Sequence, residues 1–156
     1  MKDLIRLLAK RKRNYRLIAK MIVADAYLND GVTFHFAKLD RAFCYINTRD
    51  VFLDEGEYKH PDEVFLFDLL HELGHIHTNT SKMKRCEQEF YATQWAIERF
   101  EEYGLKLPPT RQFDFQKYVW DCLISGVLHR GKNMPSIYDM SLDWHDIKKN
   151  KLCKAE

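Results

Sequence analysis

Apolar residues recur at helical spacing through the first 28 positions of the chain. Those on one face are Leu4, Leu8, Tyr15, Ile18 and Ile22. Lysines and arginines occupy the other faces of the same segment, so the pattern predicts an amphipathic helix. The sequence Asn29-Asp30-Gly31 is typical of a helix end, and we expect the helix to stop there.

Three short segments rich in β-branched and aromatic residues follow, at 32–36, 42–46 and 51–53. Such segments predict strands. The polar residues 47–50 join the second segment to the third, and a turn of this length and polarity predicts a hairpin. We therefore expect a small three-stranded sheet after the first helix.

The later pattern predicts helices. One begins at Pro61, because proline fits the first turn of a helix and the acids that follow it complement the helix dipole. It continues through a run of apolar residues into the segment HELGH at 71–75. Two more helices are expected over 82–103 and 112–129, each followed by a glycine. The predicted fold class is α+β, with a first helix, a small sheet and three further helices.

Length and composition indicate a single domain. A chain of 156 residues with 46% hydrophobic and 31% charged residues can form one core but not two ordinary domains. We expect a single domain at 1–150 and a polar tail at 151–156. The net charge of +2 gives no overall sign of a nucleic-acid or membrane-surface protein. No run reaches membrane-spanning length, the N-terminus lacks a secretion signal, and the four cysteines form no CxxC pair, so we expect a cytoplasmic protein.

The segment HELGH carries the candidate chemistry. Residues four apart lie on one face of a helix, so His71 and His75 can bind the same zinc ion. Glu72 lies beside them without being a ligand. There it can accept a proton from the metal-bound water and promote attack on a carbonyl carbon. Gly74 is unfavourable inside a helix and predicts a packing constraint beside this one.

A catalytic zinc ion normally has a third protein ligand, and helical spacing separates three candidates downstream. Glu89 shares a face with apolar residues, so its carboxylate points toward the core and needs a partner there. Glu87 lies on a face that is typical of solvent exposure, and a buried thiol such as Cys86 is more often core filling than a ligand. Glu89 is favoured, with Glu87 and Cys86 as alternatives.

Several other polar residues have open roles. Asp68 lies on the metal side of its helix, where it is either a partner for a ligand histidine or a solvated carboxylate. His77 points to another face than His75, so a surface or capping role is expected. If the last helix folds over the cleft, an oxyanion could be stabilised by one of Tyr118, His129 and Tyr138.

Residues 42–96 resemble the ImmA/IrrE family of metallopeptidase domains, a gluzincin-type group found in bacteria, phages and other mobile elements. AFCYI and VFLDE resemble the strands that precede the family's metal helix. FDLLHELGH resembles its FxLAHELGH segment, and EQEFYATQWA resembles its ExEAxxFAxxLL segment. The resemblance covers about the first two thirds of the chain.

The family resemblance implies a zincin-like metallopeptidase domain. It makes His71, His75 and Glu89 the zinc ligands and Glu72 the base. It further implies an endopeptidase of narrow specificity that acts on a regulatory protein, such as a DNA-binding repressor. One of the two strand segments named above could pair with an extended peptide substrate beside the metal.

Two non-catalytic functions compete with the peptidase. The basic residues at 10–13 and Arg16 could contact nucleic-acid phosphates in a protein that keeps zinc for stability, but no helix-turn-helix or aromatic-basic pattern supports a nucleic-acid partner. The other alternative is a protein-binding regulator with a structural zinc ion. Glu72 discriminates here, because a structural site needs no base beside the metal. The oligomeric state is left open.

Overall fold

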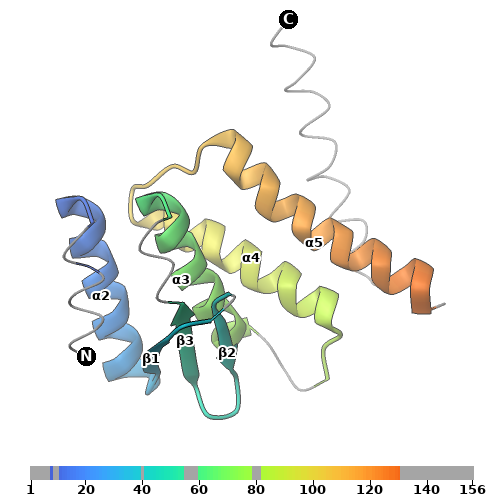
Figure 1. Cartoon of the computed structure of the whole chain (residues 1–156), viewed down its shortest axis with the longest axis horizontal. Coiled ribbons are helices and arrows are strands. Elements are labelled where there is room, and N and C mark those ends of the chain that lie inside the picture. Colours follow the sequence, from blue (N-terminus) through green and yellow to red (C-terminus); the bar gives the residue numbers. More distant parts are fainter. Residues whose placement is uncertain (1–7, 9–10, 40, 55–59, 79–81, 131–156) are drawn as a thin grey trace, which may run out of the picture.

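The computed structural model describes residues 8, 11–39, 41–54, 60–78 and 82–130. Within these ranges the chain forms four helices and one three-stranded sheet, so the predicted α+β class is confirmed. Figure 1 shows how these elements are arranged. No helix in the described ranges combines the length and the apolar character needed to cross a lipid bilayer. The expected polar tail at 151–156 lies outside the described residues.

Helix α2, Arg13–Asp30, is the helix that the N-terminal pattern predicts. It ends at Gly31 as expected, because Gly31 adopts the left-handed conformation (φ 66°) that closes the last turn with a hydrogen bond to the carbonyl of Ala26. The helix packs its Ala19, Ile22 and Ala26 side into the core.

The prediction of one continuous helix over the first 28 residues is wrong at residues 11 and 12, which are not helical. Asp62 explains the break. Its carboxylate accepts hydrogen bonds from the Lys12 N–H (3.2 Å) and from the Arg11 guanidinium (3.3 Å). The carbonyl of Lys12 then accepts the Arg16 N–H at 2.9 Å and begins α2. A contact between segments 50 residues apart therefore sets the start of this helix.

The sheet contains β1 (Thr33–Ala37), β2 (Phe43–Tyr45) and β3 (Asp50–Asp54), in the order β1-β3-β2. Strands β2 and β3 are antiparallel, which confirms the predicted hairpin, and Arg49 closes its turn with a positive φ of 55°. Strand β1 pairs with β3 in parallel and places β3 in the centre. The patterns along the chain gave no indication of this parallel pairing.

The remaining helices are α3 (Asp62–Thr78), α4 (Arg85–Glu102) and α5 (Pro109–Arg130). All three were predicted, although α5 begins three residues earlier than expected, at a proline that suits a first helical turn. Helix α3 contacts α2, α4, β2 and β3, so it is the central element of the fold (Figure 1).

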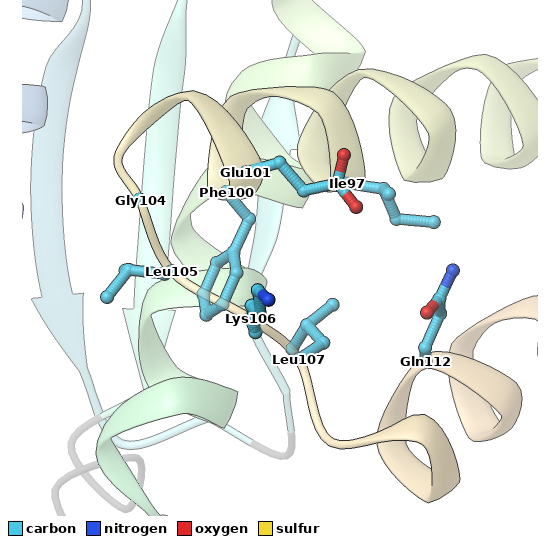
Figure 2. A pocket seen from close by; sticks show the side chains of 8 residues that line it. All are labelled: Ile97, Phe100, Glu101, Gly104, Leu105, Lys106, Leu107 and Gln112. Atoms are coloured by element: carbon cyan, nitrogen blue, oxygen red, sulfur yellow. The ribbon is translucent and has the colours of Figure 1, made fainter.

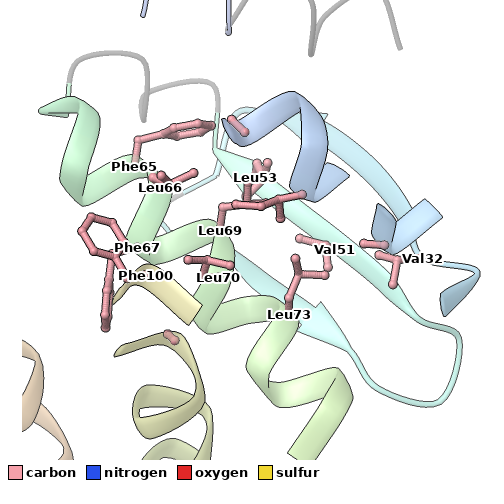
Figure 3. Close-up of a cluster of buried hydrophobic side chains, with 14 of the residues drawn as sticks. Val32, Val51, Leu53, Phe65, Leu66, Phe67, Leu69, Leu70, Leu73 and Phe100 are labelled. Carbon is pink, nitrogen blue, oxygen red and sulfur yellow. The ribbon is translucent and has the colours of Figure 1, made fainter. Parts of the chain in front are cut away.

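The hydrophobic core lies between the sheet and α3, and α2 and α4 contribute further side chains to it. Figure 3 shows Leu69 and Leu73 of α3 beside Val51 and Leu53 of β3. These four side chains are at most 1% exposed. The apolar run before HELGH thus fixes α3 against the sheet, and the opposite side of α3 is left to face α4.

A pocket of about 490 Å³ lies where α4 turns toward α5 (Figure 2). Its walls include Ile97, Leu105, Leu107 and Gln112. It is at the opposite end of α4 from Glu89, and its lining contains no histidine or cysteine. It is therefore separate from the candidate chemistry described next.

Candidate metal centre

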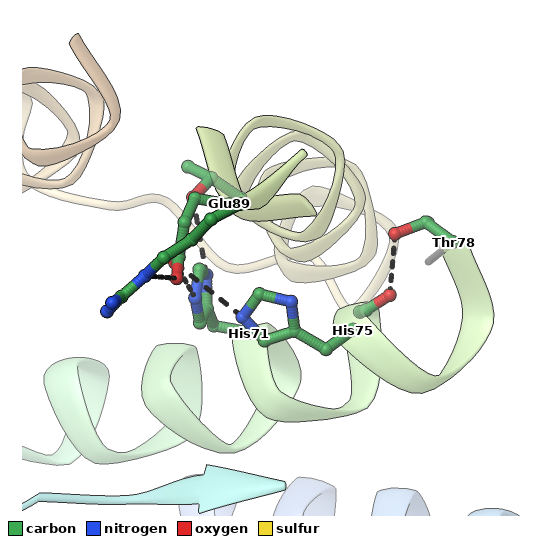
Figure 4. A network of polar contacts seen from close by, with 7 residues as sticks. His71, His75, Thr78 and Glu89 are labelled. Carbon is green, nitrogen blue, oxygen red and sulfur yellow. Dashed lines mark hydrogen bonds and ion pairs between the residues drawn. The ribbon is translucent and has the colours of Figure 1, made fainter. Parts of the chain in front are cut away.

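Helices α3 and α4 bring His71, His75 and Glu89 together. Their ligand atoms all lie within 4.8 Å of one another. The Glu89 Oε2 atom is 3.3 Å from the Nε2 atom of His71 and 3.6 Å from that of His75 (Figure 4). Within the described part of the chain, this is the one group of three or more His, Cys, Asp or Glu side chains with metal-site geometry.

The two helices can approach closely because residue 74 is a glycine. A Cβ atom at Gly74 would lie 2.6 Å from the backbone oxygen and 2.9 Å from the Cα atom of Ala92. The hydroxyl of Thr78 donates a hydrogen bond to the Gly74 carbonyl at 2.7 Å, as Figure 4 also shows. The predicted packing constraint at Gly74 is confirmed, and its effect is to hold Glu89 of α4 over the two histidines of α3.

The two distances from Glu89 to the histidines match the geometry of a zinc ion. Zinc bonds imidazole nitrogen and carboxylate oxygen at about 2.0–2.2 Å, so two ligands of a tetrahedral ion lie about 3.3–3.6 Å apart. The two distances from Glu89 fall in this range. Two imidazoles and one carboxylate are also a donor set of catalytic zinc sites, in which the fourth position is left to water or substrate.

Thr93 of α4 supports the first histidine. Its hydroxyl oxygen lies 3.2 Å from the Nδ1 atom of His71, and the residue is 1% exposed. A hydroxyl can either accept a hydrogen bond from an imidazole N–H or donate one to an imidazole nitrogen. Thr93 therefore suits the His71 tautomer that leaves Nε2 free for a metal. Thr93 was not among the predicted site residues, although it lies one helical turn after Glu89 on the same face.

Glu89 is held as a carboxylate in its buried position. Burial by itself would raise its pKa, but the hydrogen bonds and charges of His71 and His75 outweigh this effect and lower the pKa well below its ordinary value. Arg85, one turn earlier on α4, places its Nε atom 3.7 Å from the other carboxylate oxygen. Both oxygens of Glu89 thus face nitrogen groups.

Glu72 is buried, and it lines the same cleft as the three candidate ligands. Burial raises its pKa, and the nearby histidines His71 and His75 oppose this rise. Its hydrogen-bond partner is the thiol of Cys44 on β2. Burial also raises the pKa of Cys44 far above its ordinary value, so the thiol stays protonated and donates to the carboxylate. This partner was not foreseen.

The cleft has a volume of about 620 Å³ and is bounded by the β2 segment, α3, α4 and α5. Phe43 and Ile46 come from the β2 side, and Phe115 and Tyr118 come from α5. Tyr118 is thus the oxyanion candidate that lines the cleft. The side chain of His129 and all of Tyr138 lie outside the described residues.

The competing ligands take other positions. Glu87 accepts a hydrogen bond from the Lys84 N–H at 2.7 Å and caps the start of α4. Cys86 is buried, as expected of a filling thiol, and is absent from the cleft lining and from the ligand group.

The other two polar residues with open roles are also placed. Asp68 lines the cleft, 3.7 Å from the Nδ1 atom of His60. The Nε2 atom of His77 lies 3.3 Å from a carboxylate oxygen of Asp30 on α2, and the His77 ring stacks on Trp95. Both contacts are away from the metal group, which fits the predicted surface role of His77.

Comparisons with protein-family models, curated proteins and solved structures gave no match for this chain.

Proposed function

We propose that this protein is a zinc-dependent endopeptidase with a zincin-like fold. The observation that carries the proposal is the convergence of two histidines and Glu89 on one point, with Glu72 in the same cleft. A metal site that served only stability would have no use for a buried carboxylate beside its ligands. The resemblance of residues 42–96 to the ImmA/IrrE family supports the same reaction class.

When bound by His71, His75 and Glu89, zinc would lower the pKa of a water molecule and polarise the peptide carbonyl. Glu72 would accept a proton from the attacking water, whose oxygen bonds the carbonyl carbon. The same carboxyl group then gives the proton to the leaving nitrogen as the C–N bond breaks. Cys44 positions the Glu72 carboxylate for both transfers, because its thiol donates to it.

The edge of β2 is the proposed docking strand for the substrate. Of the two strands weighed from the sequence, β3 is paired on both sides and has no free edge, whereas β2 pairs only with β3 within the described sheet. Phe43 and Cys44 of β2 line the cleft. An extended peptide that pairs with this edge would pass along the metal group, with its carbonyl within reach of Glu72 and Tyr118.

The proposed substrate is a regulatory protein, such as a DNA-binding repressor. This part of the proposal rests on the family resemblance. It agrees with an edge strand that would accept an extended segment of a protein chain. We propose no nucleic-acid substrate, because the cleft contains acidic residues as well as arginines and lacks a continuous basic lining.

Co-expression with candidate repressors from the same genetic neighbourhood tests the function. We expect cleavage of one of them that stops when a chelator is added to the lysate and returns with zinc. Glu72→Gln should retain zinc and lower the cleavage rate by about 10²–10⁴-fold, because it removes the general base. Glu87→Gln is the matched control, since Glu87 caps α4 outside the cleft and its change should leave cleavage intact.

Cleavage by Glu72→Gln at the wild-type rate would refute the mechanism. Loss of cleavage in both glutamine variants would show that the assay reports folding instead of catalysis. Zinc binding without cleavage of any candidate would favour the alternative of a non-catalytic, zinc-stabilised regulator.

A further inference from the structure

Helix α2 has a second apolar side that faces solvent. Leu17, Met21 and Leu28 are 50%, 60% and 75% exposed. They lie roughly opposite the buried Ala19 and Ile22 on the helix. Four of the six large apolar or aromatic side chains that are exposed among the described residues belong to this one helix. Such clustering on an otherwise charged helix is typical of an interaction surface.

The exposed apolar positions follow a heptad pattern. Leu17, Met21, Ala24 and Leu28 are separated by four, three and four residues, which is the spacing of the a and d positions in a coiled coil. We call these four residues the outer stripe. Asn14 occupies the preceding a position and is exposed. An asparagine at one a position favours a parallel pair of helices, because two such side chains can bond each other across the axis.

The charges beside the outer stripe are self-complementary in one orientation. Lys20 lies on one flank and Asp25 on the other, and both are exposed. In a parallel pair, Lys20 of each copy faces Asp25 of the other copy, since these residues occupy the g position and the following e position. In an antiparallel pair, Lys20 would instead face the flank that carries Arg13 and Lys20 of the second copy. Charge therefore selects the parallel arrangement.

We propose that the outer stripe binds the outer stripe of a second copy of this chain, with the two α2 helices parallel about a two-fold axis. Helix α2 forms one edge of the fold (Figure 1). None of its residues lines the cleft. Both clefts of the dimer stay open. The inference is independent of the proposed peptidase function.

The length of α2 sets the strength of the association. An 18-residue helix provides about two and a half heptads, and stable isolated coiled coils use more. The interface is therefore weak, with a dissociation constant of about 10–100 µM.

Sedimentation velocity of the full chain, over concentrations up to about 200 µM, measures this association directly. Met21→Glu should be monomeric throughout, because it places a charge in the stripe. Lys20→Glu and Asp25→Lys should each weaken the dimer about tenfold, since each replaces two attractive pairs by two repulsive ones. The double variant K20E/D25K restores opposite charges and should return to within about threefold of the wild type.

Lys117→Glu is the matched control, because it makes the same charge change on α5 and should leave association unchanged. Circular dichroism shows whether each variant keeps its helices. The proposal is overturned if the wild type is monomeric over the whole range, or if the double variant is no better than the single ones. A monomeric wild type whose melting temperature falls in Met21→Glu would show that the chain itself covers the stripe, which also overturns it.

Discussion

Replacing Gly74 by alanine sets two physical effects against each other. Alanine is the better helix former by about 1 kcal/mol, so propensity alone predicts a more stable protein. The added Cβ atom would lie 2.6 Å from the carbonyl oxygen and 2.9 Å from the Cα atom of Ala92. Both contacts are with backbone, which cannot rotate away as a side chain can. Helices α3 and α4 would have to separate to admit one methyl group.

The clash is expected to win. Adding a methyl group to a tightly packed interior costs about 1–3 kcal/mol. After subtraction of the propensity gain of about 1 kcal/mol, we expect a net loss of up to about 2 kcal/mol in the free energy of unfolding, or up to about 8 °C in Tm for a domain of this size. The displacement also moves Glu89 away from His71 and His75, because these ligands lie on the two helices that separate. Zinc affinity should fall by about tenfold or more.

Thermal unfolding of the chelated protein, followed by circular dichroism, measures the loss of stability without a contribution from the metal. Isothermal titration with zinc then measures the change in zinc affinity. Gly74→Ser should behave like Gly74→Ala, because its Cβ atom occupies the same position. A Tm that rises in Gly74→Ala would refute the close helix approach, since helix propensity would then act unopposed. An unchanged zinc affinity would refute the link between this contact and the ligand geometry.

Three further predictions concern single contacts. Thr93→Val keeps the shape of the side chain but removes the hydrogen-bond partner of the His71 Nδ1 atom. Zinc affinity, measured by isothermal titration, should therefore fall about 10–100-fold. An unchanged affinity would show that Thr93 does not support the site. Arg11→Met leaves the partly buried Asp62 without its guanidinium and should lower the free energy of unfolding by about 2–3 kcal/mol in a urea titration. A loss below about 0.5 kcal/mol would contradict this. Zinc at about 100 times its dissociation constant should stabilise the wild type by about 2.7 kcal/mol but leave the Tm of His71→Ala unchanged.

Much of the candidate site follows from spacing along the chain. His71 and His75 must share a face on any helix, and Glu89 is placed by the apolar periodicity of its own helix. The structure brings these three residues together as expected. The close packing at Gly74 was also predicted correctly, because glycine is unfavourable inside a helix unless a neighbouring element leaves no room for a side chain. In each case a local pattern was enough.

Contacts between distant segments were not predictable in the same way. The start of α2 depends on Asp62, which lies 50 residues further along the chain than Lys12. The parallel pairing of β1 with β3 depends on the path of the connection between them, and no residue pattern within either strand records that path. Local patterns therefore gave the elements, most of their bounds and the β2–β3 hairpin, but not these two contacts between distant segments.

The hydrogen-bond partner of Glu72 also depends on a contact between distant segments. Cys44 lies opposite Val51 in the β2–β3 register, so its side chain is on the face of the sheet that packs against α3 and Glu72. A slip of one residue in that register would turn Cys44 to the opposite face and bring a neighbour to Glu72 instead. The sequence predicts Glu72 as the base from its position between two histidines. Its hydrogen-bond donor is decided by strand register, which is settled only when the sheet forms against the helix.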